Sequence, residues 1–102
     1  MKMGYYRNAQ LCLEKSKKLY DLNFELYLNL VKIYKKQHLL NQKIAQYQKS
    51  SYPLDTVMLG LLYIENGNKS RGITKLDNFC VSQPDLFITR DIKNYINTVL
   101  SK

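Results

Sequence analysis

The chain has 102 residues, a length typical of one domain, and its 45% hydrophobic content with nine Tyr and three Phe argues against intrinsic disorder. One His and two Cys leave little material for a zinc site or for catalysis. The net charge of +8 is uneven: residues 1–50 carry ten Lys and Arg against three acids, and residues 51–102 carry six against five. A basic half is typical of proteins that bind nucleic acid or an acidic protein, but it also arises as a solvated surface or from compositional drift in an AT-rich genome.

Neither the cysteines nor the apolar segments indicate secretion or membrane insertion. Cys12 and Cys80 lie far apart without a CxxC partner, which favours two reduced thiols. The first residues lack the continuous apolar segment of a signal peptide. The longest apolar run, 57–64, is far shorter than the roughly 20 residues that cross a bilayer. We therefore expect a soluble, cytoplasmic protein without a membrane span.

Apolar residues recur at steps of three and four along most of the chain, which predicts helices and no strands. A first helix is expected over 4–20. A second begins after Asp21 or Asn23, because either side chain can cap a helix N-terminus. It ends at Gln37-His38, and a third helix follows this break. The single His is therefore expected to be a turn residue rather than a base or a metal ligand.

Proline and glycine mark the remaining helix ends. Pro53 disfavours helix at the residue before it and suits a first helical turn, so the third helix ends there and a fourth begins. Gly67 can take a positive φ at the end of the fourth helix, and a fifth is expected over 69–82. Asp85 is placed to cap a sixth helix over 86–100. These elements predict an all-α fold, an antiparallel stack of helix hairpins with five to six helices.

Residues 53–86 carry a pattern of glycine, small and large apolar residues across two helices and their turn. The pattern consists of Leu59, Gly60, Tyr63, Gly67, Gly72, Leu76, Phe79 and Pro84. It resembles a tetratricopeptide repeat, in which the first helix carries L-G-x-x-Y, the turn holds Gly and a Pro closes the second helix. Thr56 departs from it, since a large aromatic residue is expected there. Gly60 and Gly72 each cost about 1 kcal/mol in an ordinary helix, so we expect them where two helices approach closely.

A degenerate copy of the repeat precedes it, over about 23–52. Tyr27-x-x-Leu30-Val31-x-x-Tyr34 matches the first-helix pattern, while the second helix matches less well. The resemblance therefore implies a single tetratricopeptide-like domain over 1–102, with flanking helices at 4–20 and 86–100. The alternative is an unrelated helical bundle.

The resemblance implies a binding groove, because the first helix of each tetratricopeptide repeat lines a concave surface, while Leu59 and Tyr63 serve the core. A groove that is apolar at one end and basic at the other fits an amphipathic partner helix with some acidic side chains. The alternative is that the first or sixth helix folds over this face and leaves no groove. The partner-binding residues expected from the resemblance are Leu28, Lys32, Lys35, Leu54, Val57, Leu61 and Ile64.

In length, in its two degenerate repeats and in its flanking helices, the chain resembles the type III secretion chaperones. This resemblance implies a chaperone that holds a helical segment of a secreted protein, such as the needle subunit, together with a small helical co-chaperone. The predicted function is thus a protein-binding adaptor or chaperone. The chain carries no paired carboxylates, no phosphate-binding loop and no metal-ligand cluster, so we expect no enzyme activity, no cofactor and no metal.

Nucleic-acid binding is the alternative function. Lysines at 15, 17, 18, 32, 35 and 36 alternate with Tyr20, Tyr27 and Tyr34, as phosphate contacts and stacking groups do in single-strand binders. Most of these tyrosines occupy expected core positions, however, and Arg, the better reader of phosphates and bases, occurs only three times.

Overall fold

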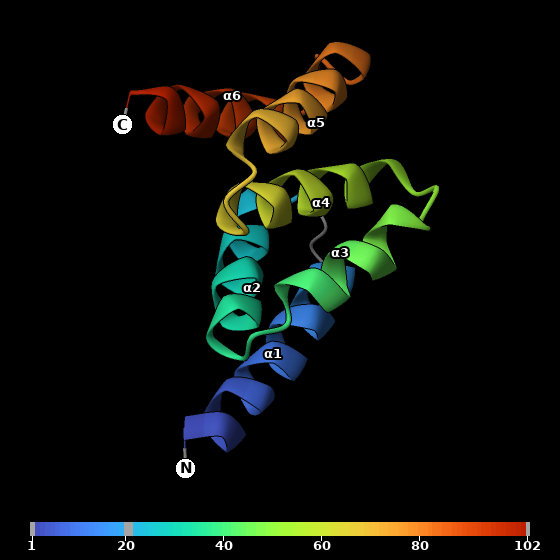
Figure 1. Cartoon of the computed structure of the whole chain (residues 1–102). Coiled ribbons are helices and arrows are strands. Elements are labelled where there is room, and N and C mark those ends of the chain that lie inside the picture. Colours follow the sequence, from blue (N-terminus) through green and yellow to red (C-terminus); the bar gives the residue numbers. More distant parts are fainter. Residues whose placement is uncertain (1, 20–21, 102) are drawn as a thin grey trace.

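Helices form the whole architecture of the computed structural model, which describes residues 2–19 and 22–101. Figure 1 shows α1 along the lower side of the molecule, α4 crossing its middle, and α5 and α6 at the top. Successive helices pack on one another as hairpins, and α2 also packs on α4 and α6. No strand occurs among the described residues, so the predicted all-α stack is confirmed. The helices are α1 (Lys2–Leu19), α2 (Phe24–Lys36), α3 (Leu40–Gln48), α4 (Pro53–Glu65), α5 (Lys69–Ser82) and α6 (Phe87–Leu100).

Most helix ends follow the local signals in the sequence. The Asn23 side chain accepts a hydrogen bond of 3.1 Å from the backbone N–H of Glu25, so the predicted cap of α2 is confirmed, while Asp21 lies outside the described residues. Pro53 occupies the first turn of α4. Gly67 has a φ of +89° directly after α4, which confirms the predicted turn.

His38 lies between α2 and α3, as predicted for the break. It is exposed and takes a left-handed φ of 60°. The next residue, Leu39, donates its backbone N–H to the Tyr34 carbonyl over 2.9 Å, which closes the turn. The position of His38 in an exposed turn is therefore the one predicted.

The predicted cap at Asp85 is wrong. The N-cap of α6 is Leu86, in an extended conformation and without a side-chain hydrogen bond. The buried Thr89 holds this turn instead, because its hydroxyl donates to the Gln83 carbonyl and its N–H donates to the Leu86 carbonyl. A cap predicted from the order of residues misses a hydrogen bond that a side chain within the helix donates to the preceding turn.

The α4–α5 hairpin is built on the two glycines that the repeat pattern indicated. A Cβ added to Gly72 would meet the Ile64 side chain and would lie 2.5 Å from the Gly60 carbonyl oxygen. A Cβ added to Gly60 would lie 2.8 Å from Cγ of Leu76. Both distances are too short for real carbon contacts, so the predicted close approach of the two helices is confirmed.

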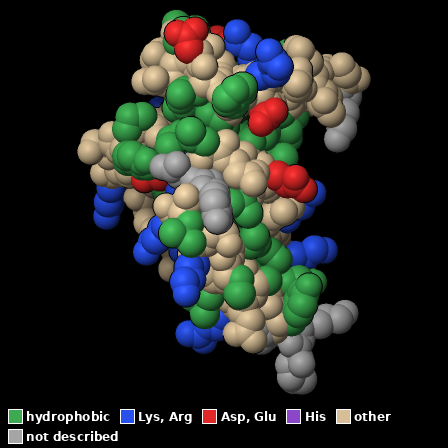
Figure 2. All heavy atoms as spheres, turned by 180° about the vertical axis from the view of Figure 1, so that it is seen from behind, with side chains coloured by type: hydrophobic (Ala, Val, Ile, Leu, Met, Phe, Trp, Pro, Cys, Tyr) green, Lys and Arg blue, Asp and Glu red, His purple; other side chains and the backbone are tan. Residues whose placement is uncertain are grey.

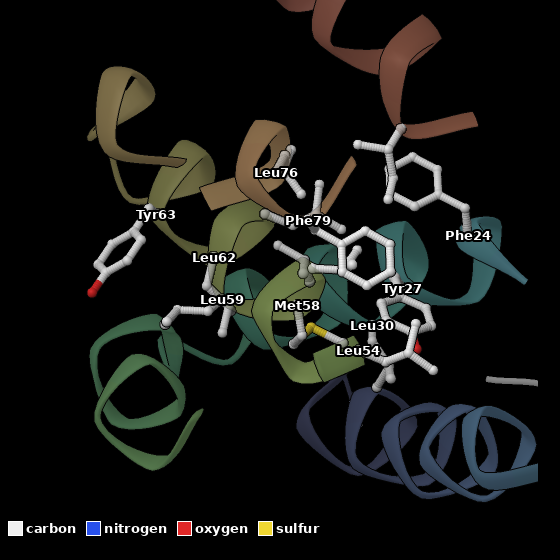
Figure 3. Packing of buried hydrophobic residues seen from close by; sticks show 14 of the residues in the cluster. Phe24, Tyr27, Leu30, Leu54, Met58, Leu59, Leu62, Tyr63, Leu76 and Phe79 are labelled. Carbon is white, nitrogen blue, oxygen red and sulfur yellow. The ribbon is translucent and has the colours of Figure 1, made fainter. Parts of the chain in front are cut away.

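The core lies on all sides of α4. Figure 3 shows Tyr27 and Leu30 of α2 meeting Met58 of α4 and Phe79 of α5. Leu59 and Tyr63 are also buried, as expected for core positions. An element that is apolar nearly all round must be covered on both sides, and the neighbours that cover α4 are α2, α3 and α5.

Candidate partner-binding site

The apolar end of the predicted groove is not open to solvent. Leu54, Val57 and Leu61 are 8%, 0% and 1% exposed, so the expectation that they line an exposed groove is wrong. The physical reason is that α2, α3 and α5 pack directly on α4 and leave this face covered. No open groove exists here, as the alternative held, but the helix that lies over this face is α2 rather than the first or sixth helix.

The other predicted residues lie in different places. Ile64 is half-buried and packs against Gly72 inside the α4–α5 hairpin. Lys35 is exposed and forms an ion pair of 3.2 Å with Glu65. Leu28 and Lys32 lie one turn apart on α2 and face a cleft toward α6. Leu61 contributes to the inner part of the same cleft. Three of the seven residues therefore come together, namely Leu28, Lys32 and Leu61.

We call this feature the α2–α6 cleft. Its outer part has a volume of about 510 Å³, and an inner part of about 220 Å³ reaches down to α4. These volumes accept several side chains but not a whole helix. The outer part is lined by Asn23, Phe24, Glu25, Leu28, Asn29, Lys32, Asp91, Asn94, Tyr95 and Thr98, and the inner part adds Val31, Leu61, Glu65 and Val99.

The wall and rim of the cleft differ in chemistry. The Phe24 and Tyr95 rings pack edge to face, with 5.6 Å between their centroids, and form a rigid aromatic wall. Burial, together with the negative charge of Glu65, raises the pKa of Tyr95, so its hydroxyl stays a neutral donor at physiological pH. Carboxylates of Glu25 and Asp91 and the ammonium of Lys32 give the rim both signs of charge.

Two amide side chains complete the cleft, and sequence reasoning missed both. Asn29 of α2 and Asn94 of α6 have no side-chain hydrogen bond within the described part of the chain, so each offers a donor and an acceptor to a ligand. Tyr95 was likewise not among the expected partner-binding residues. No local pattern could have identified these residues, because the site arises where two helices distant in sequence meet.

A second cluster of polar side chains joins α1 to α2 and α3. The Tyr34 hydroxyl donates to the Glu14 carboxylate over 2.6 Å, and Lys43 Nζ lies 3.8 Å from the same oxygen. Burial, reinforced by the neighbouring Tyr47 and by Glu14, raises the pKa of Tyr34 above its ordinary value. Tyr34 is fully buried, and a side chain that solvent does not reach cannot meet a substrate. We call Glu14, Tyr34 and Lys43 the polar cluster, and its role is to attach α1.

The alternating lysines and tyrosines do not form a stacking surface. Tyr27 and Tyr34 are fully buried and cannot stack on bases, and Tyr20 lies outside the described residues. Several lysines are also neutralised locally. The ion pairs are Lys17–Asp55 at 3.5 Å, Lys35–Glu65 at 3.2 Å and Lys43–Glu14 at 3.8 Å. Among the described residues, half of the exposed cations without an ion pair lie on α1 and α2, and the other half lie from Lys49 onward.

The described residues include no group of three or more His, Cys, Asp and Glu side chains that could hold a metal ion. Within the same part of the chain, no helix combines the length and the apolar character needed to cross a membrane. Comparison with protein-family models, with curated proteins and with solved structures finds no match.

Proposed function

We propose that this protein is a binding adaptor or chaperone that receives the apolar side of a partner's amphipathic helix in the α2–α6 cleft. The observation that carries the proposal is that Leu28 and Lys32 lie with Tyr95 in one cleft, above the buried Leu61. Two residues expected to bind a partner, Leu28 and Lys32, support the proposal, because both line this cleft.

The chemistry of the cleft supports a helical ligand that presents side chains rather than its backbone. Leu28 and Tyr95 are half-buried and present the apolar surface of the cleft, over the buried Leu61 and Val99, to anchors spaced by one helical turn. Lys32 at the rim can pair with an acidic side chain of the partner. Asn29 and Asn94 can hydrogen-bond polar groups beside the anchors, as the adaptable contacts of an interface do.

A type III secretion chaperone is the finer form of this proposal. The resemblance of the sequence in length, repeats and flanking helices supports it, and the partner would then be a helical secreted subunit, joined by a small helical co-chaperone. Nucleic-acid binding is less well supported, because the tyrosines that would stack on bases are buried in the core.

Site-specific photocrosslinking in the cells of origin tests the proposal. A photoreactive amino acid replaces Thr98, which is exposed and lines the α2–α6 cleft, and in a matched control it replaces Thr74, which is exposed on α5. We expect one dominant crosslinked protein with the Thr98 probe and none with the Thr74 probe. The purified partner should then lose affinity for Leu28→Asp and Thr98→Arg, with circular dichroism confirming that both variants fold. Equal crosslinking from the two positions would contradict the proposal.

Fluorescence anisotropy with labelled RNA and DNA at two salt concentrations tests the alternative. Phosphate binding falls steeply with salt. We expect only weak, non-specific binding. Sub-micromolar, salt-sensitive binding that Leu28→Asp leaves intact would favour nucleic acid and contradict the adaptor.

A further inference from the structure

The first helix buries little of its apolar surface. From Tyr5 onward, α1 contributes no buried residue to the core, although the half-buried Leu13 packs against it. The other contacts of α1 with the rest of the chain are largely polar. Gln10, Glu14 and Lys17 hydrogen-bond or ion-pair with α2, α3 and the start of α4.

Large apolar side chains of α1 face solvent instead. Tyr5, Leu11 and Leu19 are 68%, 57% and 69% exposed. Tyr5, Cys12 and Leu19 recur at steps of seven, so they lie along one line of the helix two turns apart. Such a line is the geometry with which one helix packs along another.

This line borders a groove between α1 and α2, with a volume of about 440 Å³. We call it the α1–α2 groove. Its lining is largely apolar, and Lys32 stands on the ridge that separates it from the α2–α6 cleft, because this residue lines both. The groove is lined by Tyr5, Ala9, Cys12, Leu13 and Ile33, with Asn29 and Lys32 at its α2 edge.

The rim of the groove is positively charged. Lys15 lies one turn from Cys12, and Lys36 lies one turn from Ile33; both are exposed, and neither they nor Lys32 form an ion pair in the described part of the chain. The one acid of α1, Glu14, turns inward to the polar cluster. On the face that Figure 2 shows, Lys and Arg side chains lie among hydrophobic ones over the lower part of the molecule, where α1 lies, and no acidic side chain is visible among the coloured atoms there.

From this complementarity we propose that the α1–α2 groove is a second binding site, and that its occupant is an acidic amphipathic helix of a partner protein. The apolar floor takes the partner's apolar residues, and the three lysines attract its carboxylates. A second copy of this chain does not fit, because two basic rims would repel one another. The site is independent of the proposed function of the α2–α6 cleft.

The test is a titration followed by two-dimensional amide NMR. The probe is a synthetic amphipathic peptide of about 18 residues, long enough to form a helix, with Leu on one face and Glu on the other. We expect shifts of the Ala9, Cys12 and Ile33 amides, and no comparable shift of Asn94 or Thr98. A peptide of the same pattern with Lys in place of Glu should not bind.

Charge-reversal variants test whether the lysines at the rim of the α1–α2 groove contribute to binding of the acidic peptide. Lys15→Glu with Lys36→Glu should weaken binding of the acidic peptide by at least about tenfold, whereas the control Lys69→Glu with Lys75→Glu on α5 should not. Cys12→Asp, an exposed change in the groove, should weaken it as well. Three results would overturn the proposal: no binding at millimolar peptide, shifts confined to the α2–α6 cleft, or groove shifts with phosphatidylserine vesicles but not with the peptide. Because the cleft is tested with Leu28 and Thr98, failure here leaves that function standing.

Discussion

The α4–α5 hairpin and the α1 attachment are two opposite ways to join a helix to a protein. In the hairpin, Gly60 and Gly72 bring two backbones into contact, and Leu76 fills the space beside them. At α1, the joining groups are a carboxylate, amides and an ammonium around Tyr34. The first interface is apolar and close; in the second, polar contacts accompany the half-buried Leu13, and large apolar side chains are left in solvent.

The difference indicates a division of labour, in which the hairpin stabilises the domain and α1 is able to open or to bind a partner. Dense apolar packing supplies most of the free energy of folding, so the hairpin and the part of α2 that packs on it should determine the stability of the domain. Hydrogen bonds and ion pairs contribute less on balance. A helix held mainly in this second way can open or bind a partner without unfolding the rest, and both proposed binding surfaces adjoin α2, on the two sides of Lys32.

The largest difference in stability between the two regions is expected when an apolar residue in each is replaced by glutamate. Leu61→Glu puts a carboxylate at a position that is almost fully buried and should cost about 5 kcal/mol or more, as much as the whole free energy of unfolding of a marginally stable domain. Leu11→Glu puts the same group on exposed α1 and should change stability by less than about 0.5 kcal/mol. Urea denaturation followed by circular dichroism measures both. A folded Leu61→Glu variant would contradict the assignment of α4 to the core.

The second largest difference in stability is expected from substitutions that add side-chain volume in each region. Gly72→Leu forces atoms into the Gly60 carbonyl and the Ile64 side chain, and we expect a loss of about 1–3 kcal/mol. Ala9→Leu adds volume where α1 borders the open α1–α2 groove and should cost less than about 0.5 kcal/mol. A melting temperature raised by Gly72→Leu would show that the hairpin contact is not as close as described.

The hairpin and the fourth helix also show what could and could not be predicted from the sequence. Gly60, Gly72 and Gly67 were identifiable because glycine inside a helix or after one has few physical explanations. The exposure of Leu54 or Val57 was not, because it depends on how α2, an earlier helix in the chain, packs on α4. The all-round apolar character of the fourth helix already indicated burial on both sides, and that local signal was more reliable than positions carried over from a repeat family.

The α2–α6 cleft illustrates the same limit. Leu28 and Lys32 were expected in a site because they share one face of a helix with a known binding role in the resembling family. Asn94 and Tyr95 were not, since their contribution arises only from the return of α6 onto α2. A sequence pattern predicts faces of single helices well, but a site between two helices requires their relative placement.

A moderate effect is expected at high pH, at the polar cluster. Burial raises the pKa values of Tyr34 and Tyr47 above their ordinary value near 10, so the unfolded chain loses these protons first as the pH rises. Stability should therefore be unaffected by these groups below about pH 10 and should fall above it, by up to about 1.4 kcal/mol per pH unit for each tyrosine. Tyr34→Phe should make the decline shallower. An identical alkaline profile in this variant would contradict the burial of the Tyr34 hydroxyl.

The smallest effect is expected at the Lys35–Glu65 pair. Lys35 is largely exposed, and exposed pairs contribute little because water and salt screen them. Lys35→Ala should lower stability by less than about 0.5 kcal/mol in thermal denaturation. A loss above 1.5 kcal/mol would mean that the α2–α4 contact depends on charge, against the comparison made above.

Hydrogen–deuterium exchange of the native protein, resolved amide by amide, tests the contrast between the two regions most directly. Amides of α4 and α5 should exchange only through global unfolding, while amides in the middle of α1 should exchange at least about 100-fold faster through local opening, and Glu14→Ala should widen this gap. If the α1 amides are instead as slow as those of α4 and α5 and respond to the same global transition, the polar attachment of α1 is as strong as the hairpin and the division of labour does not exist.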